Sequence, residues 1–237
     1  MIASIGSTNH FPGGTSVSRL SVYPWAAPDG LAGGTPHFHT TCSEAYVVLS
    51  GEGYVQTLSA EGFTETPLSE GVVVWFGPGI IHRLVNDHDL RLLVVMQNSG
   101  LPEAGDAVMT FPVDSLVDAE RYRSAATLDE HPEDSARARQ SLAVQGFTAL
   151  RRAVELEGPD ALVPLYRAGA ALVAPRLEQW RGIWRDGAAA AAAQTASMLD
   201  ALEAGDPAHL SAARLDSRPH PAHAYGMCGY LDTYLLA

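Results

Sequence analysis

Residue usage changes sharply near residue 112, and this change limits the architecture to two unlike parts. Residues 1–112 contain 14 of the 22 glycines but only 8 alanines, whereas residues 113–237 contain 8 glycines and 28 alanines. Glycine is typical of the turns between short strands, and alanine is the strongest helix former. We therefore expect a mainly β N-terminal part followed by an all-α C-terminal part.

Short runs of β-branched and aromatic residues fill the N-terminal part, and glycine-rich or polar turn signals separate them. Many short strands at a spacing of about 8–12 residues are typical of β-sandwiches and β-barrels. The sequence predicts strands at residues 17–23, 45–49, 54–58, 72–76, 82–85 and 90–97. It predicts turns between them, including turns at residues 51–53 and 86–89.

The C-terminal part has the patterns of amphipathic helices. Residues 133–157 are predicted to form the longest helix, because apolar residues recur on one face from Ala143 onward, with Pro132 before the segment and Gly158 after it. Gly146 inside this segment weakens the helical pattern. Further helices are expected at residues 114–122, 160–173, 175–185, 188–204, 207–215 and 222–236. We divide the chain into a β-barrel domain at residues 1–112, a connector at 113–131 and an α-helical domain at 132–237.

Composition excludes several functional classes. The formal net charge is −12, so phosphate backbones and anionic membrane surfaces are not expected partners. All 15 basic residues are arginines, and the absence of lysine excludes Schiff-base enzymes and P-loop nucleotide binding. Two cysteines, Cys42 and Cys228, cannot supply a disulfide framework or a cysteine-based zinc site.

Neither a targeting signal nor a membrane span is visible in the sequence. Residues 1–11 lack the basic segment and the apolar run of a signal peptide. No stretch approaches the roughly 18–20 uninterrupted apolar residues that cross a bilayer. We expect a soluble, cytoplasmic protein.

The strongest chemical signal is a pair of histidines followed by a glutamate. Residues two apart in a strand face the same side, so His37 and His39 point into one interior. Glu44 follows after a spacer of four residues and can return to that space. A glycine-rich turn delivers His82 to the start of a later strand. Three imidazoles and one carboxylate that converge in a small barrel make a mixed nitrogen and oxygen metal site.

These residues stand in a pattern that resembles the first motif of the cupin superfamily, Gly-x5-His-x-His-x(3,4)-Glu-x6-Gly. His37, His39, Glu44 and Gly51 fit the motif. The opening glycine departs from it, because Gly30 lies one place too early.

The second cupin motif, Gly-x5-Pro-x-Gly-x2-His-x3-Asn, follows further along the chain. Gly71, Gly79, His82 and Asn86 fit it, whereas Pro78 stands one place late. The displaced proline leaves the ligand spacing intact. The resemblance covers roughly residues 15–100, which is under half of the chain.

The resemblance implies a double-stranded β-helix, or jelly-roll barrel, with metal ligands at His37, His39, Glu44 and His82. This ligand set suits one divalent transition metal, namely iron, manganese, nickel, cobalt or zinc, with iron favoured. Four protein ligands on a six-coordinate metal leave two positions for water, substrate or dioxygen. We also expect a homo-oligomer, most simply a dimer, because cupin relatives often pair through sheet edges.

Four further residues are candidates near this site. Tyr46 shares its strand face with Glu44, and both are assigned catalytic roles, Tyr46 as a proton donor or substrate anchor. Core packing is the alternative role for Tyr46. Gln56, Trp75 and Cys42 are expected to line the substrate cavity. Their alternative roles are a solvated strand face, core packing and a buried inert thiol, respectively.

Three classes of function fit these residues. A non-haem metal dioxygenase or other oxidoreductase acting on a small polar organic substrate comes first, because dioxygenases are common among cupins that keep all four ligands. A metal-dependent sugar isomerase or epimerase comes second, because residues 71–86 are similar to the matching run of cupin-type phosphoglucose isomerases. Residues 1–112 contain only three arginines, however, and a phosphate pocket usually needs more positive charge. The third class is a small-molecule sensor without catalysis.

Overall fold

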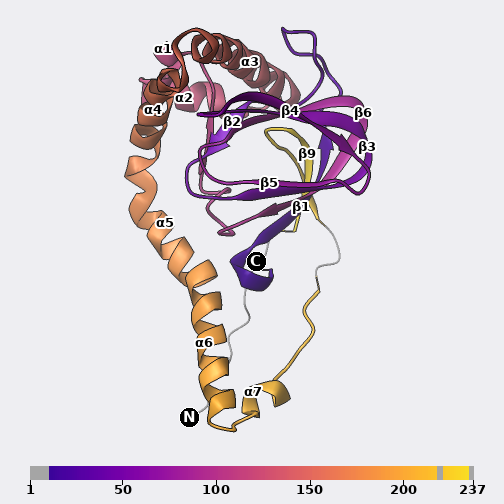
Figure 1. The fold of residues 1–237 in the computed structure, drawn as a ribbon, viewed down its shortest axis with the longest axis vertical. Coiled ribbons are helices and arrows are strands. Elements are labelled where there is room, and N and C mark those ends of the chain that lie inside the picture. The colour runs from indigo at the N-terminus through magenta and orange to yellow at the C-terminus, as the bar shows by residue number, and fades with distance from the viewer. Residues whose placement is uncertain (1–10, 218–220, 235–237) are drawn as a thin grey trace.

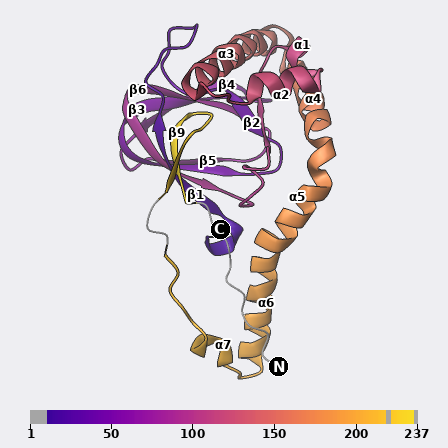
Figure 2. The same ribbon diagram turned by 180° about the vertical axis from the view of Figure 1, so that it is seen from behind.

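A computed structural model describes residues 11–217 and 221–234 of the chain. An antiparallel sheet, built mainly from the N-terminal half, curls into a barrel (Figure 1). The helices begin against this barrel and then continue as a long arm that extends beyond it, which the reverse view also shows (Figure 2). The predicted order of a β-barrel followed by a helical region is confirmed.

All pairings within the sheet are antiparallel. The main path runs β4-β3-β6-β1-β9-β8, while β2 pairs with β6 and β7, and β5 pairs with β3. The strands of the described residues are β1 Ser16–Val22, β2 His37–His39, β3 Glu44–Ser59, β4 Gly62–Ser69, β5 Val73–Phe76, β6 Ile81–Met96, β7 Ala107–Met109, β8 Ala222–Tyr225 and β9 Gly229–Thr233.

Strands β3 and β6 have 16 residues each, and each combines two of the predicted strands. Our predicted turns at residues 51–53 and 86–89 are wrong, because these segments lie opposite each other inside the two strands and shift their register. Gly51 has φ of +80°, and a Cβ atom there would lie 2.3 Å from the carbonyl oxygen of Asp89. A β-bulge uses the same glycine-rich and polar residues as a turn, so the sequence pattern did not separate the two.

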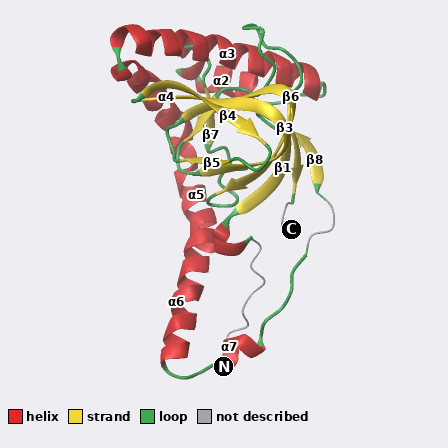
Figure 3. Cartoon of the chain, turned by 45° about the vertical axis from the view of Figure 1, so that its right-hand side comes forward, coloured by secondary structure: helices red, strands yellow, loops and turns green. Residues whose placement is uncertain are grey.

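The helical region runs from residue 113 to residue 211, and its long helix matches the prediction within one residue. Helices α5 and α6 are joined by a π-helical turn into one rod, drawn in red in Figure 3. None of the described helices combines the length and the apolarity that a bilayer crossing requires. The α-helices are α1 Val113–Leu116, α2 Ala119–Ala126, α3 Pro132–Glu157, α4 Val163–Val173, α5 Leu177–Trp184, α6 Ala190–Glu203 and α7 Ala208–Ser211.

Helix α3 packs across the barrel and is tied to it by buried polar contacts. Gln140 donates a hydrogen bond from Nε2 to the carbonyl oxygen of Gly33 at 2.6 Å. The hydroxyl of Thr110 donates to the carbonyl oxygen of Ala143 at 2.9 Å. These contacts fix the position of α3 on the sheet because each satisfies a buried polar group that would otherwise be costly.

Gly146 lies where α3 comes closest to the chain that enters it. A Cβ atom at this position would lie 1.9 Å from the backbone oxygen of Thr110. Glycine is therefore required by the packing even though it lowers helix propensity by about 1 kcal/mol relative to alanine.

We expect Gly146→Ala to lower the free energy of unfolding by about 1–3 kcal/mol, because the overpacked helix must shift. Gly182→Ala in α5 is the matched control, since a Cβ atom there would meet no other part of the described chain within 4 Å. The control should raise the stability by about 0.5–1 kcal/mol. Urea unfolding of both variants tests the account, and a stabilised Gly146→Ala protein would contradict it.

The C-terminal segment returns to the barrel as a β-hairpin. Our predicted helix at residues 222–236 is wrong, because β8 and β9 form this hairpin and β9 pairs with β1, with Leu20 opposite Leu231. Residues 235–237 lie outside the described part of the chain. Pairing with the free edge of β1 outweighs the local helix propensity, a tertiary effect that local patterns do not report. The division into three domains stays a prediction.

Candidate metal centre

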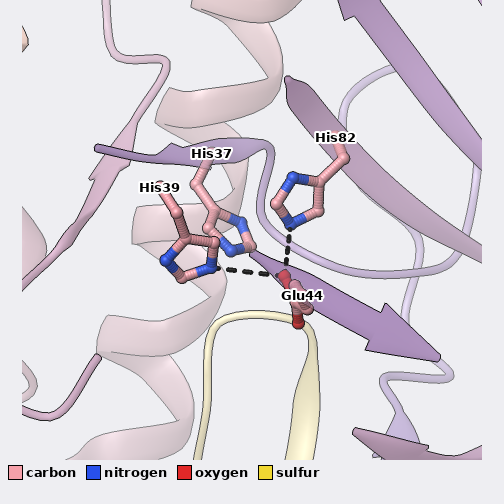
Figure 4. A group of neighbouring side chains, drawn as sticks. All are labelled: His37, His39, Glu44 and His82. Carbon is pink, nitrogen blue, oxygen red and sulfur yellow. Dashed lines mark ion pairs between the residues drawn. The ribbon is translucent and has the colours of Figure 1, made fainter. Parts of the chain in front are cut away.

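Four side chains from three strands converge inside the barrel (Figure 4). They are His37 and His39 from β2, Glu44 from the start of β3 and His82 from β6. Their ligand atoms lie within 4.8 Å of one another, and all four residues are buried. The predicted convergence of these residues is therefore present in the structure.

Strand pairing and alternation place these side chains. His37 is the cross-strand partner of His82, which brings the two imidazoles together. Phe38, between the two histidines of β2, points to the opposite side and packs against Tyr166 of α4, with ring centroids 5.4 Å apart. The outer face of β2 is thus covered by the helical region while its inner face carries the histidines.

Two of the histidines have a fixed tautomer. His37 Nδ1 lies 2.8 Å from the carbonyl oxygen of Thr35, and His82 Nδ1 lies 3.1 Å from the carbonyl oxygen of Ile80. A carbonyl oxygen only accepts, so each Nδ1 carries the proton and donates it. The Nε2 atom of each neutral ring is left with a free lone pair that faces the cluster.

His39 is oriented by Asp106, which precedes β7. The two residues are joined by a hydrogen bond of 3.0 Å from His39 Nδ1 to Asp106 Oδ2. The same carboxylate accepts from the backbone N–H groups of Thr40, Thr41 and Cys42 and from both threonine hydroxyls. A carboxylate that holds the far nitrogen of an imidazole is the usual support of a histidine metal ligand.

Three buried atoms of the cluster lie close together without hydrogen bonds. Glu44 Oε2 lies 3.2 Å from His39 Nε2 and 3.1 Å from His82 Nε2, distances at which protonated imidazoles form ion pairs with it, yet none of the three atoms makes a hydrogen bond (Figure 4). A neutral imidazole with its proton on Nδ1 turns a lone pair toward the carboxylate instead, and burial removes the water that would separate the two. A divalent cation among these atoms would satisfy all of them, so the residues present fit a metal.

The electrostatics of the cluster favour the metal-binding forms of Glu44 and His37 but not that of His39. Burial opposes a charge on Glu44, but the close approach of His39 and His82 outweighs it and holds the pKa of Glu44 well below the usual range. Burial, followed by the charges of His82 and His39, lowers the pKa of His37. Burial also lowers the pKa of His39, but Asp106 and Glu44 raise it to about 9. Metal binding must therefore displace a proton from His39.

A cavity of about 470 Å³ opens onto the cluster. Its volume falls in the range of small-molecule sites. The C-terminal hairpin, yellow in Figure 4, forms one wall close to Glu44. The walls are mostly apolar and include Leu20, Val94, Met96, Met227, Cys228 and Leu231.

The other predicted site residues differ in their burial and in their contacts. Tyr46 is buried two residues after Glu44, and its hydroxyl has no hydrogen-bond partner. Trp75 is 76% exposed, and Gln56 donates from Nε2 to Glu65 on β4 at 2.9 Å. Cys42 is buried in the core, and burial raises the pKa of its thiol. Neither Tyr46 nor any of these three side chains lines the cavity that opens onto the cluster.

Asp106 and Tyr166 were not found from the sequence, whereas Phe76 was the alternative to Trp75 on the opposite face of its strand. Phe76, the neighbour of Trp75, packs on His82 with ring centroids 4.3 Å apart. Asp106 stands in a glycine-containing loop whose pattern carries no chemical signal. Tyr166 of α4 donates its hydroxyl to the carbonyl oxygen of Gly79 at 2.8 Å, which holds the turn before His82.

One family model matches part of the barrel. Residues 26–96 match the family model of the cupin domain. No curated protein matches the sequence.

Solved structures with similar folds share little sequence with this chain. They include the nucleoside dehydratase Pac13 from Streptomyces, 17% identical over 37% of this chain and 62% of that one, with a TM-score of 0.29. A double-stranded β-helix protein from Klebsiella pneumoniae is 20% identical over 35% and 64%, with a TM-score of 0.27. The capsular polysaccharide assembling protein CapF from Staphylococcus aureus is 21% identical over 40% and 27%, with a TM-score of 0.30. This chain thus spans less than two thirds of each, and such weak similarities say nothing about activity.

Proposed function

We propose, from the premise that residues 26–96 are a cupin domain, that the chain is a metal-dependent enzyme acting on a small organic molecule. The metal would be held by His37, His39, Glu44 and His82. The observation that carries the proposal is the set of three buried ligand atoms on His39, His82 and Glu44, which lie 3.1–3.2 Å apart without a hydrogen bond between them. Such atoms are costly in a folded protein unless a cation binds them.

The reaction class that we propose is that of a non-haem dioxygenase. A redox-active divalent metal in this ligand set supplies Lewis acidity and electron transfer to dioxygen. The apolar part of the wall, which includes Leu20, Val94 and Met96, suits a substrate with a hydrophobic part. A dimer and a cytoplasmic location remain parts of the proposal.

The protein side chains contribute binding and proton handling. The apolar walls take up the hydrophobic part of a substrate and exclude water from the cluster. Glu44 and the three imidazoles supply one negative charge in all, which suits a divalent cation. Tyr46 is the proposed proton donor, since its hydroxyl is buried, partnerless and close in sequence to Glu44.

Oxygen consumption tests the proposed class. We expect iron-loaded protein to consume oxygen with at least one of three chelating probes, a 1,2-diphenol, a 1,3-diketone or a 2-hydroxy acid. Zinc-loaded and metal-free protein should consume none, because dioxygen needs a redox-active metal. Turnover of an aldose or ketose without oxygen would contradict this class in favour of an isomerase. Thermal stabilisation by a probe without any product would contradict it in favour of a sensor.

A further inference from the structure

A buried arginine shares the cavity with the candidate metal centre. Arg139 extends from α3, is only 6% exposed and lines the same cavity as His37, His39 and Glu44. It plays no part in the cluster described above.

Arg139 is held by backbone oxygens and not by an acid. One terminal nitrogen donates to the carbonyl oxygen of Ala126 at 3.3 Å, and the other donates to that of Gly226 at 2.5 Å. Its Nε is buried without a partner. No ion pair joins Arg139 to a carboxylate among the described residues, although Glu44 and Glu103 line the same cavity.

The other buried arginine among the described residues, Arg83 on β6, is held differently. Arg83 forms an ion pair with Asp29 and donates a further hydrogen bond to the carbonyl oxygen of Leu31 at 3.1 Å. Arginine does not lose its proton in proteins, so a buried guanidinium needs a counter-charge. Arg83 has one within the chain, whereas Arg139 faces a cavity from which a ligand can supply it.

We propose that Arg139 binds the carboxylate of a small organic acid whose apolar body fills the cavity. The planar guanidinium matches a carboxylate through paired hydrogen bonds. A phosphate is a poorer fit, because Arg139 is the only basic side chain among the described residues of the cavity wall apart from the histidines of the cluster. The inference names the substrate class of the proposed enzyme, and in this respect it rests on the proposed function.

Matched acids and amides test this assignment. The probes are straight-chain carboxylic acids of two to eight carbons and 3-phenylpropionate, each paired with its primary amide. Calorimetry on metal-free and metal-loaded protein should show at least one acid binding about tenfold or more tighter than its amide. Arg139→Gln should remove that preference in both forms, and Arg139→Lys should retain part of it.

A second variant separates charge from anchoring of the hairpin. Tyr23 also donates to the carbonyl oxygen of Gly226, at 2.9 Å, so Tyr23→Phe removes an anchor of the hairpin without removing a charge. This variant should keep the acid preference. Equal loss in Tyr23→Phe and Arg139→Gln would overturn the proposal, as would acids and amides that bind the natural protein alike. If Arg139→Gln does not fold, the proposal is tested by the natural protein, which should prefer acids over amides, and by Arg139→Lys, which should retain part of that preference.

The test distinguishes this inference from the metal centre. Acid binding that depends on Arg139 in a protein that takes up no metal would support the carboxylate site and refute the metal-dependent function. Acid binding that needs the metal but is unchanged in Arg139→Gln would overturn the carboxylate site and leave the metal centre standing.

Discussion

We expect His82→Ala to lower the affinity of the protein for divalent iron, manganese or zinc by about a hundredfold or more. A four-ligand protein site binds its metal with about 10–16 kcal/mol, so the loss of one ligand removes a few kcal/mol. His82 also carries one of the partnerless nitrogen atoms that face Glu44. Competition with a chromogenic chelator measures the loss directly.

The control for this result lies on the same strand. His88 is an exposed residue of β6, so His88→Ala removes an imidazole without touching the cluster. It should bind metal as tightly as the natural protein. Equal affinities of the His82→Ala and His88→Ala proteins would show that His82 is not a ligand.

We expect Asp106→Ala to lower both the stability of the metal-free protein and its affinity for metal. The carboxylate is fully buried and accepts hydrogen bonds from His39, Thr40, Thr41 and Cys42. Its removal leaves several buried donors without a partner, which costs about 3–5 kcal/mol of unfolding free energy. Loss of the support for His39 lowers metal affinity about 10- to 100-fold. Urea unfolding and chelator competition measure the two effects.

Asp106→Asn separates the two effects. Its amide oxygen can still accept from the threonine backbone, but the amide nitrogen faces His39 and favours the opposite tautomer of that ring. Metal affinity should therefore fall more than stability. Asp87→Ala, at an exposed aspartate, is the control and should change neither quantity. A stable Asp106→Ala protein with unaltered metal affinity would refute the supporting role.

The four residues of the cluster were accessible from the sequence because their geometry is local. Alternation in a strand places His37 and His39 on one side whatever the rest of the chain does. The spacing to Glu44 and the turn before His82 are also short-range features. Alternation did not place Trp75 correctly. The pattern of this short strand did not show which of its two faces points inward, and Phe76, the neighbour of Trp75, is the residue that packs on His82.

The residues that position the cluster and complete the cavity make contacts across long stretches of the chain, and local sequence patterns did not predict these contacts. Asp106 meets His39 across 67 residues, and Arg139 meets Gly226 across 87. The hairpin that closes the cavity forms only because the edge of β1 is available to it. Local propensity favoured a helix there, and tertiary pairing decided otherwise.

The two unlike parts of the chain thus build one site together. The barrel supplies the ligand side chains, while α4 covers the back of β2 and holds the turn before His82 through Tyr166. The C-terminal hairpin and Arg139 of α3 supply further walls of the cavity. Changes in the helical region are therefore expected to reach the cluster through packing.

Anomalous X-ray scattering at the absorption edge of the bound metal tests the central claim most directly. Crystals of protein reconstituted with iron, manganese or zinc should show one strong peak among the Nε2 atoms of His37, His39 and His82 and the carboxylate of Glu44. The peak should be absent from His82→Ala crystals grown in the same way. Crystals that show no peak with any of these metals, or a peak only elsewhere on the molecule, would contradict the assignment.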